Sequence, residues 1–316
     1  MSARIVYMGT PEFAVAPLEA LIDSDHDVVA VVTVPDKPAG RGRNLKASAV
    51  KEAALRHEIP VLQPEKLRDE DFQNELRSLN ADIFVVVAFR MLPKSVWSMP
   101  PKGTFNLHAS LLPNYRGAAP IHWAVINGEE ESGVTTFLID EEIDTGNILL
   151  QSKAEIGPNE TTGELYNRLM HLGAPLVVQT VDGLMQGSLE PIPQDEEAAM
   201  KPAPKLFREH QYLDLSRTAR ELHNQIRGLT PFPSPLLKLQ FGENHIEAKV
   251  AESGVEMETI GELGELVWDD TQLKIQTSEG VLTIAKIQWP GKRQMSVRDF
   301  KNGFAEWKSI GIVGKP

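Results

Sequence analysis

The hydrophobic positions in the first two thirds of the chain form short runs, and these runs alternate with segments of helical character. Most runs are rich in β-branched residues, as expected of strands that are buried on both faces of a parallel sheet. The expected strands are Arg4–Met8, Val28–Val34, Ile83–Ala88, Thr104–Leu107, Val134–Ile139 and Ile148–Ile156. The expected helices run from Thr10 to Leu21, over Ser48–His57, and from a capping box at Thr161 and Glu164 towards Met185. This alternation predicts an α/β domain with a mostly parallel sheet.

The pattern changes after residue 189. Residues 190–205 hold four prolines and an acidic cluster, which is typical of an extended linker. A short helix is expected over Ser216–Arg227. The expected strands beyond it are Leu236–Phe241, His245–Val250, Leu263–Trp268, Leu273–Thr277 and Val281–Gln288. Five short strands fit an OB-like β-barrel, a common platform for nucleic-acid strands. We therefore expect an α/β domain at 1–189, a linker at 190–205 and a barrel domain at 206–316.

Composition places the chain among soluble globular proteins. Of its 316 residues, 41% are hydrophobic and 24% are charged. Cysteine is absent, which excludes disulfides and thiol nucleophiles and fits a reducing cytoplasm. The N-terminus lacks the long apolar region of a signal peptide, and no run approaches 18 apolar residues. We expect a cytoplasmic protein that is a monomer and does not associate with a membrane.

The net charge of −12 argues at first against a nucleic-acid partner. The charge is unevenly distributed, however. Residues 1–204 carry 17 Lys and Arg against 29 Asp and Glu, whereas residues 205–316 carry 15 of each. A neutral C-terminal third can present a basic face to phosphates, whereas a uniformly acidic chain cannot do so easily.

An amide, an imidazole and a carboxylate stand at or just beyond the ends of apolar runs. Asn106 lies in the run Thr104–Leu107, His108 directly follows that run, and Asp144 follows the run that ends at Ile139. Open α/β sheets bind ligands at strand ends, and residues two apart on a strand share one face. Taken singly, each has an ordinary structural interpretation, such as a turn asparagine or a solvated acidic turn. Together they suit acyl transfer, in which one group moves protons and two stabilise an oxyanion.

The loop Pro35–Leu45 is longer than the usual connection of about four to six residues between a strand and a helix. It carries Lys37, Arg41 and Arg43, with glycines at 40 and 42. One interpretation is a plain solvent loop. The other is a basic arm that becomes ordered against a phosphate backbone.

Two kinds of site are disfavoured. Gly9, Thr10 and Pro11 follow the first strand, but the G-x-G-x-x-G pattern is missing and Pro11 has no backbone N–H for a pyrophosphate. A nicotinamide cofactor is therefore not expected. The eight histidines are scattered and no cysteine accompanies them, so we expect no metal site.

With these residues in view, the chain closely resembles the methionyl-tRNA formyltransferases over essentially its full length. The matching segments are MGTPEFA (Met8–Ala14), PDKPAGRG (Pro35–Gly42), FNLHASLLPNYRGAAPI (Phe105–Ile121), DTG (Asp144–Gly146) and PGKRQM (Pro290–Met295). The Asn-x-His and Asp core is shared by formyltransferases that use 10-formyltetrahydrofolate, so it indicates the chemistry. The basic loop and the C-terminal barrel indicate a tRNA acceptor.

The resemblance implies a Rossmann-like N-terminal domain, an OB-like C-terminal domain and formyl transfer from 10-formyltetrahydrofolate to the α-amino group of methionyl-initiator tRNA, without a metal. By motif match, Asn106, His108 and Asp144 are the catalytic residues. The implied folate-binding residues are Ser110, Leu111, Leu112 and Pro113, together with Phe89, Arg90, Met91 and Leu92, where the family often has a Tyr-Gly-type loop. The implied tRNA-binding residues are Lys37, Arg41 and Arg43.

Three other functions fit part of the pattern. A formyltransferase acting on a small amine, such as glycinamide ribonucleotide or an amino sugar, would use the same three residues. It would leave the basic loop and residues 205–316 without a task. A non-catalytic RNA-binding protein would not need Asn106, His108 and Asp144. Hydrolysis of formyl-folate to formate would proceed without any acceptor.

Overall fold

The computed structural model describes residues 2–39, 44–195, 197–198 and 201–313. The chain divides into two compact units. The first comprises Met1–Ala118, Glu131–Glu155 and Tyr166–Ala203, and the second comprises Ala119–Glu130, Ile156–Leu165 and Pro204–Pro316. Each unit has its own sheet and hydrophobic core.

The described residues of the first unit form a seven-stranded sheet in the order β5-β2-β1-β6-β7-β8-β9. The neighbours from β5 to β7 pair in parallel, whereas β8 is antiparallel to both β7 and β9. The strands are β1 (Arg4–Gly9), β2 (Asp27–Val32), β5 (Val61–Leu62), β6 (Ile83–Val87), β7 (Thr104–His108), β8 (Glu131–Leu138) and β9 (Ile148–Glu155). The mostly parallel, Rossmann-like sheet predicted from the alternating pattern is thus confirmed, although β5 was not anticipated.

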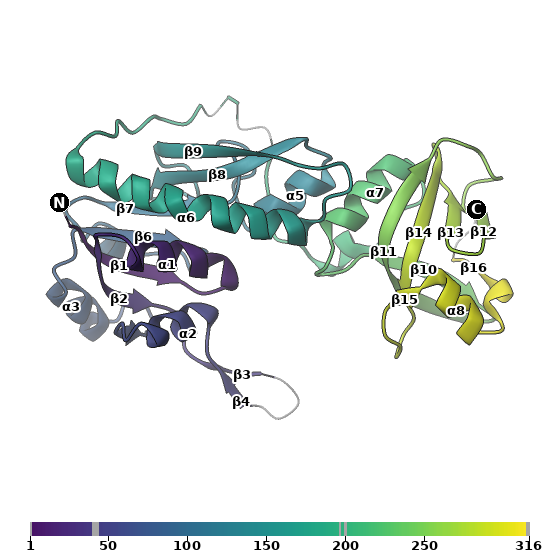
Figure 1. Cartoon of the computed structure of the whole chain (residues 1–316), viewed down its shortest axis with the longest axis horizontal. Helices are drawn as coiled ribbons and strands as arrows, with labels where there is room; N and C mark the ends of the chain where they lie inside the picture. The colour runs from purple at the N-terminus through teal and green to yellow at the C-terminus, as the bar shows by residue number, and fades with distance from the viewer. Residues whose placement is uncertain (1, 40–43, 196, 199–200, 314–316) are drawn as a thin grey trace. The chain divides into compact units, whose positions relative to one another are not determined.

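Helices cover the sheet of the first unit on both faces (Figure 1). Residues Val6, Met8 and Phe84 of the sheet share a core with α3 and α4 on one face. On the other face α6 packs against β7 and β8: Gly173 lies against Leu107, and its own side chain is only a hydrogen. The helices are α1 (Val15–Ile22), preceded by the 3₁₀ turn η1 (Glu12–Ala14), α2 (Ala49–Arg56), α3 (Glu70–Ser78), α4 (Lys94–Trp97) and α6 (Thr162–Gln186).

Part of the long basic loop is a small antiparallel ribbon. Its strands are β3 (Lys37–Ala39) and β4 (Asn44–Lys46), and Lys37 pairs directly with Lys46. At the base of the ribbon, Lys51 donates to Asp36 at 2.6 Å, and Gln63 donates to Asp36 at 2.8 Å. These bonds lower the pKa of the Asp36 carboxyl. The ribbon is therefore anchored to the sheet through a charged network.

The second unit is built around an antiparallel sheet with the order β12-β13-β14-β11-β10-β16, which curls into a nearly closed barrel. The OB-like barrel expected from the strand spacing is confirmed. The elements are α5 (Pro120–Ile126), η2 (Arg208–Gln211), α7 (Ala219–Gly228), β10 (Leu236–Phe241), β11 (Asn244–Glu256), β12 (Leu266–Trp268), β13 (Leu273–Gln276), β14 (Val281–Gln288), β15 (Met295–Ser296), α8 (Val297–Gly303), η3 (Trp307–Ser309) and β16 (Ile310–Ile312).

A buried histidine in α7 predicts how the second unit responds to acid. The ring of His223 is buried between Ser253 and Pro158, and this burial lowers its pKa below the usual 6.5. The unfolded chain therefore takes up the proton first as the pH falls. The stabilisation from neutral His223 is complete above the unfolded pKa and is lost as the pH falls through that value towards the folded one. We expect the denaturant concentration at the unfolding midpoint to decrease as the pH is lowered from 7 to 5, and to decrease less in the His223→Gln variant. An equal decrease in both proteins would contradict this.

Candidate functional site

Asn106 and His108 lie on the face of β7 that points away from α6. The alternation of side chains along a strand places Phe105 and Leu107 on the opposite face, against α6. Thr104 marks the face of Asn106, because its hydroxyl donates to the carbonyl of Trp97 in α4 at 2.6 Å. Among the described residues none hydrogen-bonds to the side chain of Asn106, which is half-buried. Its amide is therefore available to a ligand beside His108.

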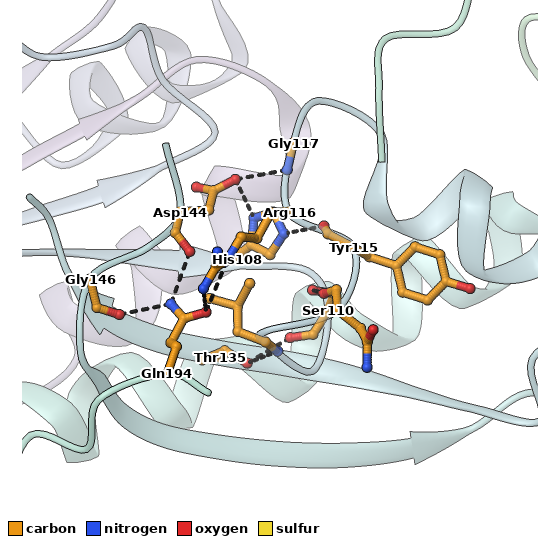
Figure 2. Close-up of polar contacts among 11 residues, drawn as sticks. His108, Ser110, Tyr115, Arg116, Gly117, Thr135, Asp144, Gly146 and Gln194 are labelled. Carbon is orange, nitrogen blue, oxygen red and sulfur yellow. Dashed lines mark hydrogen bonds and ion pairs between the residues drawn. The ribbon is translucent and has the colours of Figure 1, made fainter. Parts of the chain in front are cut away.

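The two ring nitrogens of His108 face different protein groups (Figure 2). Nε2 lies 2.8 Å from the carbonyl oxygen of Tyr115. Since a carbonyl only accepts hydrogen bonds, Nε2 must carry a proton and donate. Nδ1 lies 3.8 Å from Oδ2 of Asp144, which is an ion-pair distance. In the neutral ring, Nδ1 is thus the basic nitrogen, and it faces a carboxylate.

Asp144 reaches His108 by an indirect route. The strand β8 is antiparallel to β7, and its last residue, Leu138, pairs with Phe105 rather than with His108. Asp144 and His108 do come together, but the strand ends do not explain it, because β7 and β8 run in opposite directions. Instead the loop after β8 folds back over the sheet. Asp144 sits in this loop with a left-handed backbone, at a φ of 58°, a conformation that aspartate tolerates better than most residues.

Specific bonds hold the loop that carries Asp144. Asp140 accepts from the Thr145 hydroxyl at 2.8 Å and so closes the acidic stretch into a turn. Oδ2 of Asp144 accepts from the backbone N–H of Gly117 at 2.9 Å. The side chain of Gln194 donates to the carbonyl oxygens of Asp144 and Gly146. The loop therefore forms a structured bend, and the carboxylate of Asp144 is largely enclosed.

The segment after β7 packs against β8. Thr135, which pairs with His108 across the sheet, donates to the carbonyl of Ser110 at 2.6 Å and accepts from the N–H of Leu112 at 3.2 Å. The hydroxyl of Ser110 donates to the carbonyl of Asn114 at 2.7 Å. Ser110 and Leu112 are buried, whereas Leu111 and Pro113 are half-buried. The predicted folate segment thus forms a rigid loop directly after His108.

The other predicted folate loop borders a pocket. Arg90, Met91 and Leu92 line a cavity of about 370 Å³ together with Trp97 and Glu141. The guanidinium of Arg90 donates to the carbonyls of Pro64 and Glu65 and packs over the ring of Phe89. Burial lowers the pKa of Arg90. Arg90 therefore fixes the shape of the loop, and Met91 stays 68% exposed at its rim.

The predicted tRNA contacts are only partly described. Lys37 is exposed on the β3–β4 ribbon. Arg41 and Arg43 lie outside the described residues.

Several groups that shape the site were not predicted. They are the carbonyl of Tyr115, the N–H of Gly117, the hydroxyl of Thr135, and the side chains of Arg116 and Gln194. The first four lie in or beside segments that the sequence had already singled out. Gln194 has no such signal, because it stands in a proline-rich, acidic stretch that is typical of a linker.

Family models match both units. The model described as formyl transferase matches residues 3–181, and the model described as formyl transferase, C-terminal domain, matches residues 205–305. Together with the sheet and the barrel, these matches define an enzyme of the formyltransferase class.

Proteins named methionyl-tRNA formyltransferase are close in sequence. The one from Flavobacterium johnsoniae is 47% identical over 301 residues, covering 95% of this chain and 96% of its own. The one from Porphyromonas gingivalis is 47% identical over 309 residues, covering 96% of each chain. The chain belongs to the methionyl-tRNA formyltransferase family.

Solved structures at lower identity share the fold. An N-formyltransferase from Helicobacter canadensis, in complex with folinic acid and dTDP-3-aminofucose, has a TM-score of 0.67 and 23% identity, and covers 91% of this chain and 100% of its own. HypX from Aquifex aeolicus, in complex with tetrahydrofolic acid, has a TM-score of 0.65 and 17% identity, and covers 97% of this chain and 48% of its own.

The described residues contain neither a membrane-spanning helix nor a metal-binding cluster. Every helix among them is too short or too polar to span a lipid bilayer. Within the same residues, no three His, Cys, Asp or Glu side chains gather as a metal-binding group.

Proposed function

We propose that the protein transfers the formyl group of 10-formyltetrahydrofolate to the α-amino group of methionyl-initiator tRNA, with Asn106, His108 and Asp144 as its catalytic residues. The observation that carries this proposal is the pair formed by the basic nitrogen of His108 and the carboxylate of Asp144, beside the available amide of Asn106. Two relatives named methionyl-tRNA formyltransferase, each 47% identical to this chain, support the choice of acceptor.

His108 and Asp144 handle the proton in this proposal. The attacking amine forms a bond to the formyl carbon and loses a proton, while the bond between that carbon and N10 of the folate breaks and N10 gains a proton. Nδ1 of His108 accepts the amine proton, because Nε2 already donates to Tyr115. The carboxylate of Asp144, 3.8 Å away, stabilises the imidazolium that results. The imidazolium then returns the proton to the leaving nitrogen.

Asn106 stabilises the oxyanion in this proposal. As the amine adds, negative charge develops on the formyl oxygen, and donors that are already oriented lower the barrier. The NH₂ group of Asn106 is free to donate and shares the face of β7 with His108. Once Nδ1 of His108 has taken up the amine proton, its N–H becomes a second donor to the oxyanion. Loss of one such donor typically lowers kcat about 10²- to 10³-fold.

The folate is proposed to occupy the pocket beside Arg90, Met91 and Leu92 and to contact the loop from Ser110 to Pro113. The exposed side chain of Met91 offers an adaptable apolar surface to a flat ring. The ring of Trp97 lines the same cavity. Two proteins of similar fold have structures in complex with folinic acid and tetrahydrofolic acid, and this supports a folate ligand for the fold.

Two basic surfaces support an RNA acceptor. In the first unit, Lys37 and Lys46 stand directly opposite each other across the ribbon. Two cations in this position repel each other, and a bound phosphate relieves the repulsion. We propose that Lys37, with Arg41 and Arg43 of the same loop, contacts the acceptor arm.

In the second unit, a groove of about 1030 Å³ is lined by Lys238, Lys249 and the ring of Trp289. The carboxylate of Glu247 in this groove already pairs with Arg208. The two lysines therefore give the groove a net positive charge. This groove is the proposed contact of the barrel with the tRNA body.

The proposed function is tested with purified protein, 10-formyltetrahydrofolate and methionylated initiator tRNA. We expect N-formylmethionyl-tRNA to form, and no comparable product with glycinamide ribonucleotide or an amino sugar. Formate released at the same rate without tRNA would replace the proposal with hydrolysis. Formylation of a small amine in preference to charged tRNA would replace the acceptor. Absence of any folate turnover would leave only the fold and family assignment.

The basic surfaces yield a kinetic prediction. Arg41→Ala in the loop and Lys249→Ala in the groove are each expected to raise KM for charged tRNA several-fold and to leave kcat nearly unchanged. Each lost phosphate contact reduces the salt slope of binding by about one. Lys102→Ala is the matched control. Lys102 precedes the start of β7, whereas the basic loop follows the end of β2, so the two lie at opposite ends of the parallel strands. A variant with an unchanged KM and salt slope would remove its surface from tRNA recognition.

A further inference from the structure

A segment that follows α6 in the chain contributes a side chain to the site. Residues 190–203, here called the connecting segment, belong to the first unit. Ile192 exchanges two backbone hydrogen bonds with Ile148, just beyond the turn that carries Asp144. Further along, Lys201 accepts from the N–H of Tyr115 at 2.6 Å, and Ala203 donates to the carbonyl of Arg116 at 2.8 Å. The connecting segment therefore touches both of the loops that form the site.

Gln194 stands between these contacts and uses all of its polar atoms. Its Oε1 accepts from Nε and Nη2 of Arg116 at 3.1 and 2.8 Å. Its Nε2 donates to the carbonyls of Asp144 and Gly146 at 2.9 and 2.8 Å. An amide side chain offers two acceptor sites and two donors, so the hydrogen-bonding capacity of Gln194 is full. Figure 2 shows the side chain between Arg116 and the turn at Asp144.

These four bonds join two parts of the site that come from separate loops. Arg116 precedes Gly117, whose N–H holds the carboxylate of Asp144. Tyr115, which holds Nε2 of His108, precedes Arg116. One end of the amide thus fixes the loop that orients His108, and the other end fixes the turn that presents Asp144. The separation of Nδ1 from the carboxylate depends on both.

We infer that Gln194 is a positioning residue for formyl transfer: it sets the placement of Asp144 relative to His108 and touches neither substrate. This inference rests on the proposed function of those two residues. Gln194 is half-buried in an otherwise exposed stretch that includes Pro193 and Asp195, so it adds little hydrophobic packing. Its effect is therefore expected in the rate of the chemical step rather than in the stability of the fold.

The test compares three variants in the tRNA formylation assay. Gln194→Met keeps the length of the side chain and loses every hydrogen bond. Gln194→Glu keeps the acceptor for Arg116 and loses both donors to the turn. Gln186→Met is the control, because Gln186 is exposed at the end of α6. Displacement of a catalytic group by about 1 Å costs about 10²-fold. We therefore expect kcat to fall about 10- to 100-fold in both Gln194 variants, with KM for folate and tRNA within about twofold of wild type.

The possible results separate this inference from the proposed function. If wild type formylates no amine, the proposed function fails, and the inference that rests on it fails with it. If wild type is active and Gln194→Met keeps its kcat, the inference is overturned. A raised KM for tRNA with normal kcat would also overturn it, since the segment would then bind the acceptor. A normal kcat in Gln194→Glu would overturn it too, because the two donors that hold the turn would then be dispensable. A fall in melting temperature that accounts for the lost activity would assign Gln194 a structural role only.

Discussion

Replacing Asp144 by asparagine is expected to lower kcat by a factor of about 10² or more while folate binding survives. Asparagine has the same shape and can still accept from the N–H of Gly117. It cannot stabilise a protonated His108, because it carries no charge. A factor of 10² corresponds to about 2.7 kcal/mol of activation free energy. Asp144 does not line the pocket beside Arg90, so KM for the folate should change little.

Steady-state kinetics with charged tRNA, together with folate binding by fluorescence or calorimetry, measure the two effects separately. Glu142→Gln is the matched control: it removes one negative charge from the same loop, and Glu142 is exposed. We expect this variant to keep wild-type kcat. Near-normal turnover in Asp144→Asn would remove Asp144 from the chemistry. An equal loss in Glu142→Gln would assign the effect to the charge of the whole loop.

Local signals in the sequence predicted the elements whose stabilising contacts are also local. The capping box at Thr161 forms as expected, with Glu164 accepting from the N–H of Thr161 at 2.8 Å. The first helix differs. Thr10 and Pro11 predict a capped start, yet the chain makes a 3₁₀ turn first and the α-helix begins at Val15 without a side-chain cap. The free N–H of Phe13 donates instead to the hydroxyl of Tyr166 at 2.7 Å. That partner is distant in sequence, and no local pattern reveals it.

Some strands have a local sequence pattern, and others are defined only by their partners. Runs of buried β-branched residues, such as Ile83–Val87, are predictable from the sequence, because burial on both faces requires an apolar side chain at every position. The two-residue strand Val61–Leu62 is defined by pairing with β2 and has no pattern of its own. The short strands β15 and β16 are likewise defined by their partners β14 and β10.

In the site, motif residues were predictable and their supports were not. Asn106 and His108 share one face because they are two apart on a strand, which is a local fact. The approach of Asp144 depends on an antiparallel partner strand and on a loop that returns across the sheet. Gln194 comes from 50 residues further along the chain, and the composition around it indicates only a linker. Long-range contacts of this kind are decided by the folded backbone.

Replacing Gly146 by alanine is expected to be the most damaging change of a single methyl group at the site. A Cβ at this position would lie 1.7 Å from the carbonyl oxygen of Leu138. The obstacle is backbone, so the turn and the end of β8 must separate. That movement breaks the bond from Leu138 to Asn147, at 2.9 Å, and the bond from Gln194 to Gly146. Asp144 is then displaced, and we expect kcat to fall about 10²-fold or more.

The same clash should lower stability. Overpacking typically costs about 1–3 kcal/mol, and each kcal/mol lowers the melting temperature by roughly 2–4 °C in a domain of this size. Gly303→Ala is the control, because an added Cβ there meets no atom within 4 Å. Should Gly146→Ala fail to fold, Thr145→Val loosens the turn more gently by removing the bond to Asp140, and a smaller loss of kcat is expected. Wild-type kcat in a folded Gly146→Ala would mean that the turn can move without displacing Asp144 from His108.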